Sequence, residues 1–358
     1  MNTKHKKCLD YSLAFSAKEK MMIQDINKWL PDLIIDTHTH LTPSSCVEDI
    51  PPEIQKQMCA TFTFLSIKES EKIKSDLYPN KEIISLRMAM PFKGIDHRNV
   101  NTYLSESSSI KNQSIFCGIP DDVDYTVNGM RSEKFKALKM YPFYFINPDG
   151  SIYQYFKPEI LKEANDLSLP IILHLPTKVT SCLSQLEELL STFPKLPVVL
   201  AHMGREREYS AELGGAYSIL KEYPNLFIET STIPSIDVFK SALENFGENR
   251  IIFGSDEPYN LIRATVVSLE NKRQRFLTTY NYNWVDKEEQ KKLSLQFPDK
   301  SSSLILMHFQ NLYALKESLD QTFLSAQDRE RVKNKIFSVN AANIFKIAIS
   351  SISRNFHQ

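Results

Sequence analysis

The sequence predicts a (β/α)8 barrel, the fold also known as a TIM barrel. The first observation is a series of eight short apolar runs, at residues 33–36, 83–90, 115–119, 137–140, 171–173, 198–201, 226–229 and 251–254. Each run is rich in Ile, Val, Leu or Phe and is bounded by Pro, Gly, Asn or Asp, which is typical of strands buried on both faces of a parallel sheet. The second observation is helical spacing between most of the runs, and the third is a length of 358 residues, enough for one large barrel with insertions.

Helical spacing of apolar residues is clearest in the second half of the chain. It predicts helices at residues 161–167, 183–193, 217–223 and 236–246, each followed within three residues by Pro or Gly. The ends of the chain are predicted to be helical as well, at residues 17–30 and 326–350. We therefore divide the chain into an N-terminal helical extension, residues 1–30, and a barrel domain, residues 31–358.

Two connections are too long to be plain loops between a strand and a helix. They follow the first and the eighth predicted strands, at residues 41–82 and 257–310. The first contains Ser66 followed by Glu69, a capping box that predicts a helix over 69–77. Because segments that follow strands lie at the face where barrel active sites occur, we expect both insertions to shape the pocket. The alternative is that they only decorate the surface.

Composition and charge exclude several kinds of partner. The formal net charge is zero, so no bulk field attracts nucleic acid or an anionic membrane. No stretch approaches the roughly 20 apolar residues of a membrane span. The five cysteines are scattered and lack C-x-x-C spacing, which favours reduced thiols over disulfides: Cys8, Cys46, Cys59, Cys117 and Cys182. We expect a cytoplasmic protein that acts on a small molecule. A homodimer is compatible with these observations.

Histidine and aspartate residues follow four of the predicted strands. His38 and His40 stand at i and i+2 after the first strand, so both side chains leave it on the same side. His174, His202 and Asp256 end the fifth, sixth and eighth strands. Taken singly, each has an ordinary interpretation: a loop histidine, a histidine at a strand end or an N-cap aspartate. Together they converge on the mouth of a closed barrel, and imidazole with one carboxylate suits Zn²⁺, with Fe²⁺, Mn²⁺ or Co²⁺ as alternatives.

Three cationic residues are candidates for contact with a substrate. Lys139 closes the fourth predicted strand, Arg87 lies in the second, and Arg205 follows His202 by three residues. A charge at the end of an apolar strand must be paired or lie at the barrel mouth. Structural ion pairs are the alternative for all three.

The chain resembles the amidohydrolase superfamily, within it the amidohydrolase-related (amidohydrolase-2-type) branch of metal-dependent hydrolases and decarboxylases. The matching motifs, in the order of the family, are Asp36-Thr-His-Thr-His40, Leu173-His174, Ala201-His-Met-Gly204, Phe253-Gly-Ser-Asp256-Glu-Pro258 and Asn340-Ala-Ala-Asn-Ile-Phe345. The resemblance implies that the metal ligands are His38, His40, His174 and Asp256. It also implies that His202 orients or polarises the water or the substrate, and that the reaction is C–N or C–O hydrolysis or non-oxidative loss of CO₂.

We therefore predict hydrolysis of an amide, ester or lactone by a metal-activated water, with Asp256 as general base and His202 assisting. The alternatives are decarboxylation of a small unsaturated or aromatic acid at the same metal, and a barrel that binds a metal or metabolite without catalysis. In two-metal relatives a lysine on the fourth strand is carboxylated and bridges the metals. Lys139 is followed by bulky, fairly apolar residues, so we expect an ordinary lysine and a single metal.

Overall fold

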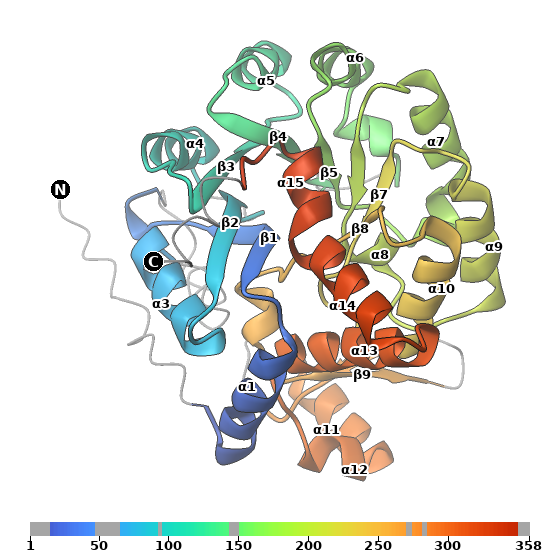
Figure 1. Ribbon diagram of the computed structural model, residues 1–358. Coiled ribbons are helices and arrows are strands. Elements are labelled where there is room, and N and C mark those ends of the chain that lie inside the picture. Colours follow the sequence, from blue (N-terminus) through green and yellow to red (C-terminus); the bar gives the residue numbers. More distant parts are fainter. Residues whose placement is uncertain are drawn as a thin grey trace.

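Eight parallel strands pair in chain order and form the barrel (Figure 1). The computed structural model describes residues 15–46, 65–91, 95–142, 150–269, 274–280 and 285–349. The strands are β1 (Leu33–Leu41), β2 (Glu82–Ala89), β3 (Asn112–Cys117), β4 (Phe135–Met140), β5 (Ile171–Leu173), β6 (Val198–Leu200), β7 (Leu226–Glu229) and β8 (Ile251–Ile252). All eight predicted runs form strands, and the predicted (β/α)8 barrel is confirmed.

The segment that follows β8 closes the barrel against β1. Thr39 and Glu257 form a parallel bridge. The amide of Asp256 donates to the carbonyl of His38 at 2.8 Å, and the amide of His40 donates to the carbonyl of Glu257 at 2.7 Å. These bonds lie side by side, so closing the barrel also brings His38, His40 and Asp256 together.

Strand β1 is longer than the predicted run and has an irregular register between Asp36 and Thr39. Ile35 belongs to the core inside the barrel, whereas Asp36 contacts a helix outside it. With strict alternation, Ile35 would share a face with Thr39 rather than with His40. The register shift therefore explains how Ile35 and the two histidines all face the interior.

A ring of helices surrounds the strands (Figure 1). The helices that follow the eight strands are α3 (Ile67–Leu77), α4 (His97–Glu106), α5 (Val123–Met130), α6 (Pro158–Leu167), α7 (Val179–Thr192), α9 (Ala211–Leu220), α10 (Ile236–Phe246) and α13 (Met307–Thr322). The capping box at Ser66 and Glu69 is present and begins α3. Helix α9 begins and ends earlier than the predicted segment 217–223, because Ser210 caps its first turn.

The two long connections contain structure of their own. In the first, Ser44–Cys46 is a 3-10 turn, residues 47–64 lie outside the described residues, and α3 joins the outer ring. The second contains the turn η4 (Tyr259–Leu261), an antiparallel pair β9 (Thr265–Ser268) and β10 (Gln274–Leu277), and helices α11 (Lys287–Gln296) and α12 (Pro298–Ser302). Short helical segments also occur at Ile152–Gln154 and at α8 (His202–Arg205).

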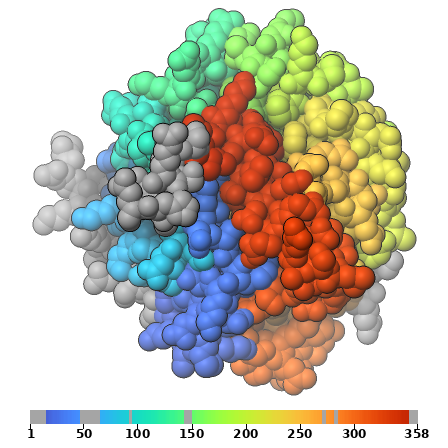
Figure 2. Space-filling view, in the orientation of Figure 1, coloured from blue at the N-terminus to red at the C-terminus, as the bar shows by residue number. Residues whose placement is uncertain are grey.

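The end of the chain covers the N-terminal end of the barrel. The predicted helix over 326–350 is helical from 326 to 344, as α14 (Ala326–Asn334), a π-helical turn (Lys335–Val339) and α15 (Asn340–Ile344). The Asn340 side chain donates to the carbonyls of Glu248 and Ile251, each at 2.8 Å, which anchors α15 beside the start of β8. Phe345 packs with the inward-facing strand residues. In the space-filling view this red segment crosses the middle of the face (Figure 2).

Helix α1 (Ala17–Trp29), within the predicted extension, is fastened to the segment after β8 by a buried ion pair. Glu19 is fully buried and accepts hydrogen bonds from Nε and Nη2 of Arg263, at 2.8 and 2.7 Å. It also accepts from the amides of Leu306 and Ser16, at 3.2 and 2.9 Å. All carboxylate oxygens are therefore satisfied, and removing the charge leaves Arg263 without its partner.

We expect Glu19→Gln to lower the free energy of unfolding by about 2 to 3 kcal/mol, because it breaks a bidentate, mostly buried pair. Burial raises the pKa of Glu19, but the bonds from Arg263 and Ser16 outweigh it and leave the pKa below its ordinary value. The pair's contribution is therefore full above about pH 5 and is lost as the pH falls through the folded-state pKa. Urea unfolding at several pH values measures this. Glu159→Gln, an exposed first-turn glutamate of α6, should change stability by less than about 0.5 kcal/mol.

Candidate metal centre

His38, His40 and Asp256 meet in a buried cluster at the mouth of the barrel. The ligand atoms of these three residues all lie within 4.8 Å of one another. His40 Nε2 is 3.1 Å and His38 Nε2 is 3.5 Å from the same oxygen, Oδ1 of Asp256. The structure thus brings together three of the four residues predicted as metal ligands.

The hydrogen bonds of the two histidines define which ring nitrogen is free. His40 Nδ1 lies 3.2 Å from the carbonyl of Ala89, which can only accept, so Nδ1 carries the proton. His38 Nδ1 lies 3.0 Å from Oε2 of Glu229 and donates to it in the same way. In neutral rings both Nε2 lone pairs then face an oxygen of Asp256. Such acceptor-to-acceptor contacts require a cation between them, and these donors fit a divalent metal.

Burial favours the neutral form of the His38 imidazole. The pKa of His38 lies well below its ordinary value because of burial and, secondarily, the nearby Lys139 cation. Burial would raise the pKa of Asp256, but the rings of His202, His38 and His40 around it bring that pKa below its usual value. A neutral imidazole and an ionised carboxylate are the forms that bind metals.

His202 and His174 form a second pair next to the first. His202 Nε2 is 3.2 Å from His174 Nδ1, and the rings of His38 and His202 have centroids 5.0 Å apart. His174 is not within the tight group of His38, His40 and Asp256. Its role as a metal ligand stays a prediction. Its ring contacts His202, which in turn lies beside His38. Burial holds the pKa values of both His174 and His202 well below the ordinary value.

The backbone is unusual at the two residues predicted to carry out catalysis. His202 and Asp256 have φ values of 54° and 59°, in the left-handed region that side chains rarely adopt. Such conformations cost about 1 to 3 kcal/mol each and are found preferentially at functional sites. At Asp256 the bond from its amide to the carbonyl of His38 holds the conformation.

Glu229, at the end of β7, is a site residue that we did not predict. It is fully buried and accepts from Nδ1 of His38, from the amide of His202 at 3.0 Å and from the hydroxyl of Ser231 at 2.9 Å. A side chain at Gly254 would lie 2.3 Å from Oε1 of Glu229, so only glycine leaves room for this carboxylate. Burial raises the pKa of Glu229 to about 7. Glu229 thus orients both His38 and the loop that begins at His202.

We expect Glu229→Gln to weaken divalent-metal binding about 10- to 100-fold, because the variant keeps the shape but removes the anionic partner of His38. Chelator competition on the purified variant measures the Kd. Glu206→Gln removes another buried carboxylate, which pairs with Lys178 at 3.1 Å, and should leave the metal affinity unchanged. An unchanged Kd in Glu229→Gln would show that this carboxylate does not support the site.

A buried charge network supports the metal site from outside the barrel. Lys74 of α3 forms a short contact with Asp36 and lies 3.3 Å from Glu257. Asp36 precedes His38 by two residues, and Glu257 follows Asp256 directly. Asp36 also accepts from the amide and the hydroxyl of Ser255. The network therefore joins the backbones that carry the ligands of β1 and of the segment after β8.

The three residues predicted to contact the substrate lie in different parts of the structure. Lys139 is fully buried inside the barrel, and its Nζ has no hydrogen-bond partner among the described residues. Burial lowers its pKa to about 8, while the nearby carboxylates of Asp256 and Glu229 partly oppose this. Lys139 therefore lies where it could contact a substrate at the centre.

The structure does not bring Arg87 to the barrel mouth. Its neighbours Leu86 and Met88 face the interior, so Arg87 points outward between the strand and α3. There it donates to Asn112 at 2.7 Å and to the hydroxyl of Ser70 at 2.6 Å. Arg205 is half-buried beside His174 and donates to the carbonyls of Leu175 and Pro176, at 2.8 and 2.6 Å.

Comparison with known proteins identifies the family of the chain. The family model described as Amidohydrolase matches residues 130–347, more than half of the chain. The chain therefore belongs to the amidohydrolase family, in its amidohydrolase-2 branch, as its motifs predict. No curated protein matches it in sequence. In the described part of the chain, no helix combines the length and apolar character needed to cross a membrane.

Solved structures share the fold at low sequence identity. An amidohydrolase from Burkholderia multivorans with bound zinc has a TM-score of 0.55 at 12% identity, and the alignment covers 88% of this chain and 100% of that one. A protein from Pseudomonas putida designated as 2-pyrone-4,6-dicarboxylic acid hydrolase has a TM-score of 0.53 at 13% identity, covering 89% and 99%. The 5-carboxyvanillate decarboxylase of Novosphingobium aromaticivorans, solved with manganese, has a TM-score of 0.50 at 14% identity, covering 88% and 96%.

Proposed function

We propose that this protein is a metal-dependent hydrolase of an amide, ester or lactone bond in a small molecule. The observation that carries the proposal is the convergence of the Nε2 atoms of His38 and His40 on one oxygen of Asp256, in a buried site. His38, His40, Asp256 and the adjacent His174 would hold one divalent metal, with Zn²⁺ favoured by the donor set. The metal would lower the pKa of a bound water towards about 7.

The side chains around this position supply the remaining chemistry. The Asp256 carboxylate is ionised and can accept the proton of an attacking water, then return it to the leaving group. His202 donates from Nδ1 to Ser231 Oγ at 2.7 Å, because that hydroxyl itself donates to Glu229. Its ring is thereby held in place to orient the water or the substrate. Lys139, a buried cation without a hydrogen-bond partner among the described residues, can stabilise negative charge that develops on the substrate.

Non-oxidative decarboxylation of a small unsaturated or aromatic acid is the second candidate. The fold relationship to a 5-carboxyvanillate decarboxylase supports it, and the same metal-binding residues would serve both reactions. In this case Lys139 and Arg205 would contact the carboxylate that is lost. Three further predictions from the sequence stay predictions: the cytoplasmic location, the small-molecule substrate and a homodimer.

One assay separates these functions. Metal-loaded protein is incubated in ¹⁸O-labelled water with a panel of esters, lactones, amides and unsaturated or aromatic acids. Hydrolysis incorporates ¹⁸O into the product, whereas decarboxylation releases CO₂ and leaves the organic product unlabelled. Activity on no member of the panel would favour a barrel that binds a metal or metabolite without catalysis.

A further inference from the structure

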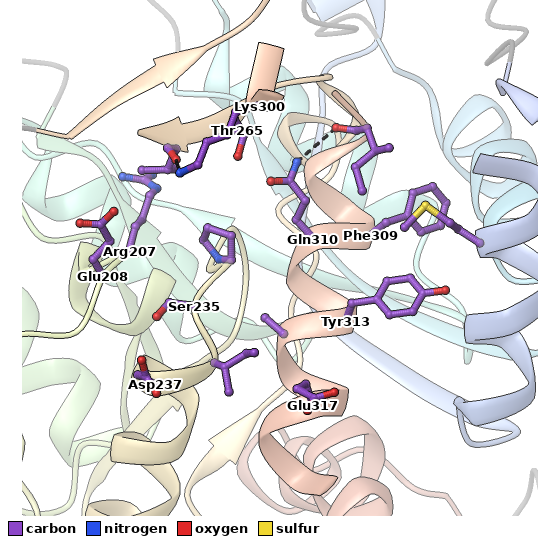
Figure 3. A pocket seen from close by; sticks show the side chains of 16 residues that line it. Arg207, Glu208, Ser235, Asp237, Thr265, Lys300, Phe309, Gln310, Tyr313 and Glu317 are labelled. Carbon is purple, nitrogen blue, oxygen red and sulfur yellow. Dashed lines mark hydrogen bonds between the residues drawn. The ribbon is translucent and has the colours of Figure 1, made fainter. Parts of the chain in front are cut away.

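A cavity of about 820 Å³ has a lining that includes none of the metal-binding residues. Figure 3 shows the side chains that line it. Its walls come from the segment after β6, the first turn of α10, strand β9, and helices α12 and α13. Its volume is within the range of about 300 to 1,000 Å³ that is typical of small-molecule sites. The proposed hydrolase activity does not use this cavity.

Arg207 lines this cavity and carries a buried hydrogen-bond donor, Nε. Its guanidinium lies over the ring of Phe276, 4.9 Å from the centroid, and its Nε is buried without a hydrogen-bond partner among the described residues. Burial lowers the pKa of Arg207 to about 10, and the neighbouring Arg205 cation adds to this effect. A partly desolvated guanidinium without an acceptor is unfavourable, so an anion that binds here gains a charge-assisted hydrogen bond.

The charges in the cavity are unevenly distributed. Lys300 lies at the same end as Arg207, with its Nζ 3.5 Å from the carbonyl of Val266 in β9. Figure 3 shows these two cations near β9, whereas Asp237 and Glu317 lie at the other end, on α10 and α13. Glu208 is also near Arg207, and its carboxylate, which accepts a hydrogen bond from Ser268, offsets part of the positive charge at this end.

Apolar residues also line the cavity, and Pro234 and Ile236 among them are partly exposed. A ligand with one negative charge would place it beside Arg207 and Lys300. A second negative charge at the far end would be repelled by Asp237 and Glu317. An uncharged, apolar body would instead bury surface against the apolar lining residues.

We propose that this cavity is a second small-molecule site, which binds a monoanionic organic carboxylate with its charged group on Arg207 and Lys300 and its apolar body against Pro234 and Ile236. None of the residues that would hold the metal lines this site. Binding can therefore be tested whether or not the substrate of the barrel is known.

Isothermal titration calorimetry on the full-length, metal-loaded protein tests this, with 4-phenylbutanoate as probe and 4-phenylbutanamide as its uncharged control. We expect a Kd of about 1 mM or tighter for the carboxylate and at least about tenfold weaker binding of the amide. Arg207→Met should weaken carboxylate binding at least about tenfold. Lys300→Met, at an exposed position, should weaken it by a smaller factor without disturbing the fold.

Two further variants locate the probe. Ala314→Phe narrows the cavity from α13 without changing any charge and should abolish binding. Arg329→Met removes a cation of α14 outside the cavity and should leave binding unchanged. Absence of binding to the wild type would overturn the proposal. So would binding that survives both Arg207→Met and Ala314→Phe but is lost in His40→Ala, since the probe would then occupy the metal centre.

Discussion

Asp256→Asn is expected to lower kcat by about 10²- to 10⁴-fold while KM changes little, measured at saturating metal. The substitution keeps the shape of the side chain but removes the general base, whose typical contribution has this size. The Asp256 carboxylate is flanked by three imidazoles and its pKa lies below the ordinary value. The acidic limb of the pH–rate profile should therefore disappear in any residual activity.

Asp166→Asn provides the matched control for this variant. Asp166 is an exposed aspartate of α6, in the outer ring of helices, that pairs with Lys162. Its substitution should leave kcat unaltered. Wild-type kcat in Asp256→Asn itself would remove Asp256 from the mechanism.

His38→Ala and His40→Ala are each expected to lose metal and activity together. Both histidines direct Nε2 at Asp256, and Nδ1 of each ring donates to another acceptor. Nδ1 therefore cannot bind the metal in place of Nε2. The loss of metal affinity should exceed the 10- to 100-fold typical of an outer partner such as Glu229. Chelator competition with a metal indicator gives the two Kd values.

His97→Ala is the control for histidine removal. His97 is also buried, but its Nε2 lies 3.0 Å from the carbonyl of Met90, and it belongs to α4 in the outer ring. This variant should keep the wild-type metal affinity even if it is less stable. Wild-type metal affinity in both His38→Ala and His40→Ala would contradict the assignment of these ligands.

The sequence was sufficient for the barrel and for most of the residues at its mouth. Short apolar runs separated by helical spacing mark parallel strands, and polar residues that end such runs must meet at one face. Glu229 carries the same signal as Asp256, since it ends the run 226–229. Treating every strand-end carboxylate alike would have identified it.

Strict alternation along β2 also indicates that Arg87, which lies between inward-facing Leu86 and Met88, points outward. Other features depend on contacts that periodicity does not reveal. The role of Lys74 requires a contact with Asp36, 38 residues away along the chain, and nothing in the spacing of α3 marks it as more than a surface lysine. The register shift in β1 likewise follows from closure against the segment after β8.

The metal content of the purified protein, determined by inductively coupled plasma mass spectrometry beside its activity, tests the central claim most directly. We predict about one equivalent of a divalent metal per chain, retained in His202→Ala, because His202 is expected to act on water or substrate while His38, His40, His174 and Asp256 hold the ion. Fully active protein without metal would contradict this account. So would two equivalents per chain with a carboxylated Lys139, because His174 and His202 would then be ligands of a second ion.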